Sequence, residues 1–159
     1  MIILDTNVVS ETLRLNPHYN VLTWLNEKDN DELYLSAIVL AELFSGVTCI
    51  PEGKRQREFK HKLAEAVQIR FDEQILPFDT LCALQYAELM GKNQRQGRLM
   101  SMADTQIAAT CLHYGAALAP RNTKDFIHCG IELIDPWQAS TGRRLHEEAA
   151  EYYVMSRKP

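Results

Sequence analysis

Short apolar runs alternate with longer stretches of helical periodicity along most of this chain. The runs are too short for helices and are rich in Ile, Leu, Val and Ala, so they predict buried strands at 2–4, 33–36, 75–78, 116–119 and 131–134. The periodic stretches predict helices at 7–15, 21–25, 37–47, 54–71, 80–98 and 101–114. Because strands and helices alternate, we expect an α/β fold with a central parallel sheet of four to five strands and helices on both faces.

The helix expected at 37–47 is unusual because apolar residues nearly encircle it, which is typical of the interior or of an interface. Glu42 is the only charge within it, and burial of an unpartnered glutamate costs roughly several kcal/mol. No lysine or arginine lies three or four positions from Glu42. Any partner for this carboxylate must therefore come from elsewhere in the fold.

Two aspartates also stand at the ends of predicted elements. Asp5 follows the first strand directly, which places it at the carboxyl edge of a parallel sheet, where ligands bind in open α/β folds. Both Asp5 and Thr6 would also serve as a helix N-cap. Asp104 lies three residues after Ser101, a spacing that resembles a capping box and suits the helix dipole.

A divalent cation would serve Asp5, Glu42 and Asp104 at once if the fold brings them together. Mutually close carboxylates raise one another's pKa unless a cation neutralises them. Oxygen ligands without His or Cys select magnesium or manganese. Such an ion supports hydrolysis of a phosphodiester bond by activating a water molecule.

Composition narrows the remaining possibilities. The 159 residues are about one domain, and the net charge of −4 does not indicate general nucleic-acid binding. No apolar run approaches the roughly 20 residues of a membrane span, and no basic leader precedes the first strand, so we expect a cytoplasmic protein that does not bind membranes. The four cysteines are widely spaced, so we expect reduced core residues, and the five histidines show no spacing typical of zinc.

Four segments, taken together, resemble one known family. They are ILDTNVVSE at 3–11, SAIVLAEL at 36–43, SMADTQIAA at 101–109 and RNTKDF at 121–126. The sequence resembles the PIN-domain ribonucleases, specifically the VapC/FitB-like toxins of bacterial type II toxin–antitoxin pairs. The resemblance implies a PIN domain over residues 1–137, followed at 138–159 by a polar extension that forms a helix or a frayed tail.

The resemblance also implies roles for particular residues. Asp5, Glu42 and Asp104 match the acids that hold Mg²⁺ or Mn²⁺ in the family, with Thr6, Asn7 and Asn122 ordering the site. The fourth catalytic acid is either at the position of Asn122 or at Asp125, and Asp125 is favoured here. Pro120 departs from the Thr or Ser of relatives and removes a backbone donor beside the site.

The partners implied by the family are a small antitoxin, an RNA substrate and a second copy of the chain. The antitoxin tail packs in a toxin groove, which the helices at 7–15, 37–47 and 54–71 could line, and operator DNA is bound only through the antitoxin. Arg121 and Lys124 flank the acids in sequence and are the candidates for contacts with RNA phosphates.

Two functions from different classes follow. The first is a metal-dependent endoribonuclease toxin, and the second is a catalytically weak or inactive PIN-like module that acts through antitoxin binding and operator autorepression. Pro120 and Asn122 motivate the second. A receiver domain that accepts a phosphoryl group on Asp5 fits poorly, because this chain has no cluster of acids just before the end of that strand. Dinucleotide binding is excluded because no G-x-G-x-x-G follows the first strand.

Overall fold

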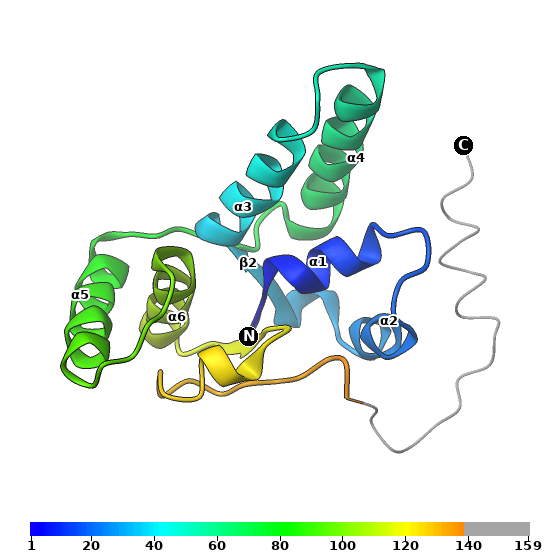
Figure 1. The fold of residues 1–159 in the computed structure, drawn as a ribbon. Helices are drawn as coiled ribbons and strands as arrows, with labels where there is room; N and C mark the ends of the chain where they lie inside the picture. The colour runs from blue at the N-terminus through cyan, green and yellow to red at the C-terminus, as the bar shows by residue number, and fades with distance from the viewer. Residues whose placement is uncertain (139–159) are drawn as a thin grey trace.

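The computed structural model describes residues 1–138 and contains a four-stranded parallel sheet in the order β3-β2-β1-β4 (Figure 1). The strands are β1 Ile2–Leu4, β2 Leu33–Ser36, β3 Ile75–Leu76 and β4 Ala117–Ala119. Ile2 pairs with Leu33 on one side and with Ala117 on the other. The N-terminal strand is therefore central, and segments far apart in sequence flank it.

Helices connect the strands, as the alternation predicts. They are α1 Thr6–Thr12, α2 Tyr19–Asn26, α3 Ala37–Thr48, α4 Lys54–Phe71, α5 Thr80–Arg95 and α6 Met102–Tyr114, with short 3-10 turns η1 Asn30–Glu32 and η2 Thr123–Asp125. Side chains of Ser36, Asp79 and Ser101 cap α3, α5 and α6 by accepting a backbone N–H. Gly115 ends α6 at φ 62°, a left-handed conformation that glycine adopts without strain.

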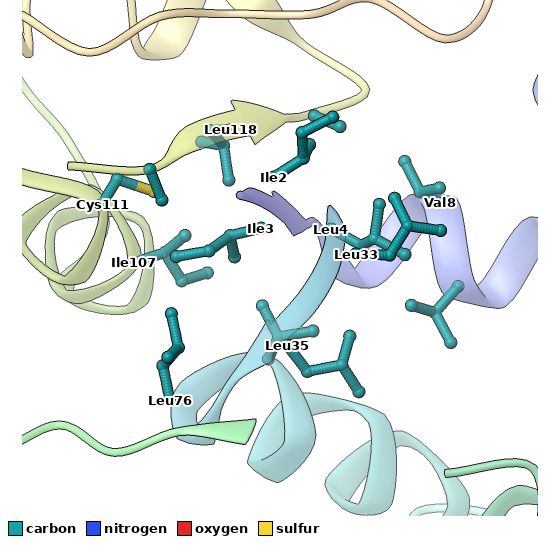
Figure 2. Packing of buried hydrophobic residues seen from close by; sticks show 14 of the residues in the cluster. Ile2, Ile3, Leu4, Val8, Leu33, Leu35, Leu76, Ile107, Cys111 and Leu118 are labelled. Atoms are coloured by element: carbon teal, nitrogen blue, oxygen red, sulfur yellow. The ribbon is translucent and has the colours of Figure 1, made fainter. Parts of the chain in front are cut away.

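The core is formed where helices cover both faces of the sheet. Every residue of β1 and β4 is buried, and since successive strand residues point to opposite faces, neither face is open to solvent. Figure 2 shows Ile3 of β1 and Ile107 of α6 pointing toward one another, and both side chains are fully buried. The predicted α/β fold with a parallel sheet is confirmed.

Several predicted boundaries are wrong. The first helix ends at Thr12, three residues before the predicted limit. Residues 131–134 do not form a fifth strand: they make a single bridge, Leu118 with Leu133. β4 has only three residues to pair with, and Pro136 has no N–H with which to extend the ladder. β3 stops at Leu76 for the same reason, because Pro77 follows it.

The cysteine prediction is correct at three positions and wrong at one. Cys82, Cys111 and Cys129 are buried, whereas Cys49 is exposed at the C-terminus of α3. Among residues 1–138, no helix is long and apolar enough to cross a membrane. The helix or tail predicted at 138–159 lies outside the described residues.

Candidate active site

Asp5 occupies the position that the sequence predicts, at the carboxyl end of β1. Its backbone N–H donates to the Ala119 carbonyl oxygen at 3.2 Å, which extends the pairing of β1 with β4 by one residue. Its side chain caps α1 and is only 7% exposed. Oδ2 accepts from Asn7 Nδ2 at 3.1 Å and from the Arg121 N–H at 3.4 Å, so the carboxylate is held in one orientation.

Glu42 meets its partner from another part of the chain, as its isolation in an apolar helix predicts. Thr6 Oγ1 donates a hydrogen bond to Glu42 Oε2 at 2.5 Å. Thr6 is the first residue of α1 and directly follows Asp5, whereas Glu42 lies in the middle of α3. This contact connects the start of α1, next to Asp5, with the middle of α3.

Asp104 combines a capping position at the start of α6 with a place in the lining of the acidic pocket. Its backbone N–H donates to Ser101 Oγ at 3.0 Å, which confirms the capping interaction at the start of α6. The Ser101 hydroxyl also contacts Asp104 Oδ2 at 2.6 Å. The cap therefore fixes the carboxylate, and Asp104 faces the same pocket as Asp5 and Glu42.

The loop after β4 contributes the fourth acid. Asp125 is exposed at the end of η2, and Asn122 Nδ2 donates to its Oδ2 at 2.7 Å. Asn122 and Asp125 are thus linked to each other, and both face the pocket. Pro120 is buried at the end of β4, and the backbone donor to Asp5 comes from Arg121 instead.

These residues surround one open pocket of about 260 Å³ at the carboxyl edge of the sheet. It is lined by Asp5, Thr6, Asn7, Glu42, Asp104, Asn122, Asp125 and Phe126. No Lys, Arg or His lines it, and within residues 1–138 none of the four carboxylates forms an ion pair. Four acids without a protein cation, in a set that offers only oxygen ligands and amide donors, fit a hard divalent cation.

The carboxylates surround the pocket at some distance from one another. Within the described part of the chain, the one set of three His, Cys, Asp or Glu donor atoms lying within 4.8 Å of each other is Asp79, Cys82 and His113, outside this pocket. No three of the four pocket acids therefore lie close enough, among the described residues, to hold one ion directly without movement or bridging water.

The two proposed phosphate-binding residues do not line the pocket. Arg121 and Lys124 are exposed, and the Arg121 guanidinium stacks on the Trp137 ring at 4.3 Å from its centroid. We did not predict that Phe126 lines the pocket or that Trp137 contacts Arg121. Phe126 ends the RNTKDF segment, and its apolar side chain beside three polar neighbours is the signal that could have identified it.

A second pocket of about 220 Å³ adjoins the first. It lies between α1, α3 and α4, and its lining includes Ser10, Leu43, Gly46 and Phe59. Thr6 and Glu42 line both pockets, so the two lie next to each other. The groove predicted between these three helices is therefore present.

The Thr6–Glu42 hydrogen bond gives a direct test of the pocket as a cation site. Thr6→Val removes the hydroxyl and keeps the side-chain shape, so we expect Mn²⁺ affinity to fall by about 10–100-fold as Glu42 loses its orientation. Calorimetric titration with Mn²⁺ measures this. Thr6→Ser keeps the hydroxyl and serves as the control, and equal affinity for both variants would contradict the role of Thr6.

Comparison with known proteins gives a consistent family. A family model described as "PIN domain" matches residues 2–131. The VapC ribonuclease Y4jK of Sinorhizobium fredii is 39% identical over 87% of this chain and 99% of its own, and toxin FitB of Neisseria gonorrhoeae is 36% identical over 86% and 99%. A structure of FitAB bound to an IR36 DNA fragment has a TM-score of 0.82 and 34% identity, covering 90% of this chain and 100% of the matched chain. This chain belongs to the PIN domain family.

Proposed function

We propose that this chain is a metal-dependent endoribonuclease that acts as the toxin of a type II toxin–antitoxin pair and hydrolyses RNA phosphodiester bonds. One observation carries the proposal: acids from four separate segments line one pocket, and no basic side chain lines it. Relatives that match nearly the full length of this chain are a VapC ribonuclease and toxin FitB, which supports the same activity.

In this proposal, Asp5, Glu42 and Asp104 hold the ion, with Asp125 as a further catalytic acid. Thr6 fixes Glu42 by its hydroxyl, Ser101 fixes Asp104, and Asn122 fixes Asp125. Asn7 orients Asp5 through its amide. The chain thus supplies each carboxylate with a donor that fixes its orientation, which reduces reorganisation when RNA binds.

The ion in this proposal is Mg²⁺ or Mn²⁺, because the lining offers oxygen ligands only. When bound, such an ion polarises a phosphoryl oxygen and lowers the pKa of a coordinated water. Arg121 and Lys124 lie at the rim on the loop after β4 and would contact phosphates away from the reacting bond.

The partners proposed are an inhibitory antitoxin and a second copy of the chain, with operator DNA bound only through the antitoxin. The groove between α1, α3 and α4 supports the first, because it lies next to the acidic pocket and shares Thr6 and Glu42 with it. The similar FitAB structure is bound to a DNA fragment, which supports a DNA-bound complex. We place the protein in the cytoplasm, where its proposed RNA substrate is.

The activity is tested with purified protein and RNA of mixed sequence. We expect cleavage with Mg²⁺ or Mn²⁺, loss of cleavage with excess EDTA, and recovery when the ion is added back, because the proposed reaction needs an ion to polarise the phosphoryl oxygen and to lower the pKa of the attacking water. Fragment lengths on a denaturing gel measure it. Cleavage that persists in EDTA would rule out the metal-dependent reaction.

An inactive binding module remains the alternative, since Pro120 and Asn122 depart from the family's pattern. Absence of Mn²⁺ binding at millimolar concentration would favour it. Inducible expression distinguishes a toxin from an inactive binding module. A toxin arrests growth, and co-expression of the small neighbouring reading frame relieves the arrest. Growth unaffected by expression of the chain alone would contradict the toxin assignment.

A further inference from the structure

A second group of chemically reactive side chains lies where α5 begins and α6 ends. Asp79 caps α5, Cys82 lies in its first turn, and His113 is near the C-terminus of α6. One donor atom from each of these three residues lies within 4.8 Å of the other two. None of the three lines the acidic pocket.

The Asp79 carboxylate interacts with the start of its own helix, with His113 and with the Tyr114 hydroxyl. Oδ1 accepts the backbone N–H of Cys82 at 2.9 Å, which is the helix cap, and Oδ2 faces His113 Nε2 at 3.7 Å. The Cys82 thiol is 3.7 Å from the Pro77 carbonyl oxygen. One carboxylate oxygen, one imidazole nitrogen and one sulfur are therefore turned toward a common space.

The group is open on one side and closed on the other. The Asp79 side chain is 40% exposed and that of His113 is 23% exposed, whereas Cys82 is fully buried. An ion could thus enter from solvent between the carboxylate and the imidazole and reach the sulfur at the base. This arrangement differs from a surface group of acids, because a buried soft ligand is combined with two accessible ones.

We propose that Asp79, Cys82 and His113 form a site for a divalent transition-metal ion of the Zn²⁺ class, separate from the acidic pocket. Sulfur, imidazole and carboxylate are the ligand types that Zn²⁺ takes in proteins, and three of them leave a fourth position for water. Zn–ligand lengths require donor atoms roughly 3.3–3.6 Å apart. The Asp79 and His113 donor atoms are already 3.7 Å apart, and all three donors lie within 4.8 Å of one another, so only a small closure is needed on binding. Mg²⁺ does not favour such a set, because it prefers oxygen ligands.

The pKa shifts of the two acidic ligands act in opposite directions on metal binding. The Cys82 N–H lowers the pKa of Asp79, which keeps that carboxylate charged, whereas burial raises the pKa of the Cys82 thiol. Coordination therefore breaks the S–H bond, forms a metal–sulfur bond and releases one proton to solvent. The charge on the buried sulfur is then neutralised by the ion.

An ion bound here would connect the start of α5 to the end of α6. Helix α6 carries Asp104 in its first turn, so the site would hold in place a helix that contributes to the acidic pocket. Sequence spacing did not indicate this site, and zinc was not expected, because the chain offers no paired His or Cys motif. Only the antiparallel contact of the two helix ends brings residue 113 to residues 79 and 82.

The test uses the full-length, chelator-treated protein and Co²⁺ alone as a spectroscopic substitute for Zn²⁺. We expect one equivalent of Co²⁺ to produce a thiolate-to-cobalt charge-transfer band in the near ultraviolet. The band should be lost in Cys82→Ser and retained in Cys49→Ser, which changes an exposed cysteine outside the group. It should also remain in Asp5→Asn, because the acidic pocket contains no sulfur ligand.

A second variant covers the case in which Cys82→Ser does not fold. His113→Gln changes a more accessible ligand, and we expect it to weaken Co²⁺ binding by about 10–100-fold. Zn²⁺ at a hundred times its dissociation constant should raise the Tm of the wild type by about 5 °C and that of His113→Gln by much less. Absence of the band in the wild type, its persistence in Cys82→Ser, or equal Zn²⁺ stabilisation of wild type and His113→Gln would overturn the proposal.

Discussion

Replacing Asp5 with Asn is expected to reduce RNA cleavage by at least about 100-fold while the fold remains intact. Asp5 is the least exposed of the four acids in the pocket, and the substitution removes its negative charge. Asp5 also directly precedes Thr6, which donates the hydrogen bond to Glu42. Asn caps helices as well as Asp does, so α1 should begin at the same residue. Initial rates at saturating Mn²⁺ measure the effect.

Thermal stability separates a catalytic effect from misfolding. We expect the Tm of Asp5→Asn to stay within a few degrees of that of the wild type, because removing one of the four negative charges of the pocket offsets the loss of one oxygen that accepts hydrogen bonds. Asp72→Asn is the matched control, since Asp72 is an exposed aspartate at the end of α4, outside the pocket, and its activity should be unchanged. Full activity in Asp5→Asn would exclude this residue from the ion site.

Ile3→Ala is expected to lower the free energy of unfolding by about 3–4 kcal/mol, through lost burial and the cavity that remains. Ile3 is fully buried in the central strand and faces Ile107 of α6. The strands on both sides of β1 limit how far the structure can collapse into the space. Equilibrium urea denaturation measures the change, with the midpoint shifted and the slope unchanged.

An exposed aliphatic residue is the control for this second prediction. Leu15 is 97% exposed after α1, so Leu15→Ala should change the free energy of unfolding by less than about 0.5 kcal/mol. A loss below about 1 kcal/mol for Ile3→Ala would mean that β1 is not packed as described. Similar losses for the two variants would lead to the same conclusion.

The sequence predicts most of this fold because burial on both faces leaves a distinct signal. The strands are continuous apolar runs, and the helices between them have helical periodicity. The prediction fails where short apolar runs meet prolines. Residues 131–134 have the composition of a strand, but they form a single bridge, because the neighbouring strand β4 has only three residues and Pro136 lacks an N–H. Pairing depends on the partner strand, which the local pattern does not contain.

The acidic residues of the site can be predicted from the sequence, whereas the hydrogen bonds and ring contacts around them cannot. Glu42 is conspicuous as the only charge in an apolar helix, and Asp5 because it directly follows a buried strand. The Thr6 hydroxyl that bonds Glu42 spans 36 positions, and no local pattern specifies it. The stacking of Arg121 on Trp137 is likewise tertiary, and it turns a predicted phosphate ligand toward an aromatic ring.

The central place of β1 in the sheet has a consequence for biosynthesis. β1 is made before both of its neighbours and pairs on one side with Leu33 and on the other with Ala117, so its second neighbour exists only when more than 110 further residues have been made. Sequence-distant pairing of this kind slows folding, since loop closure precedes the contacts that stabilise it. Nascent chains that end before β4 thus lack the strand and loop that complete the pocket, so the four acids are brought together only after residue 125 has been made.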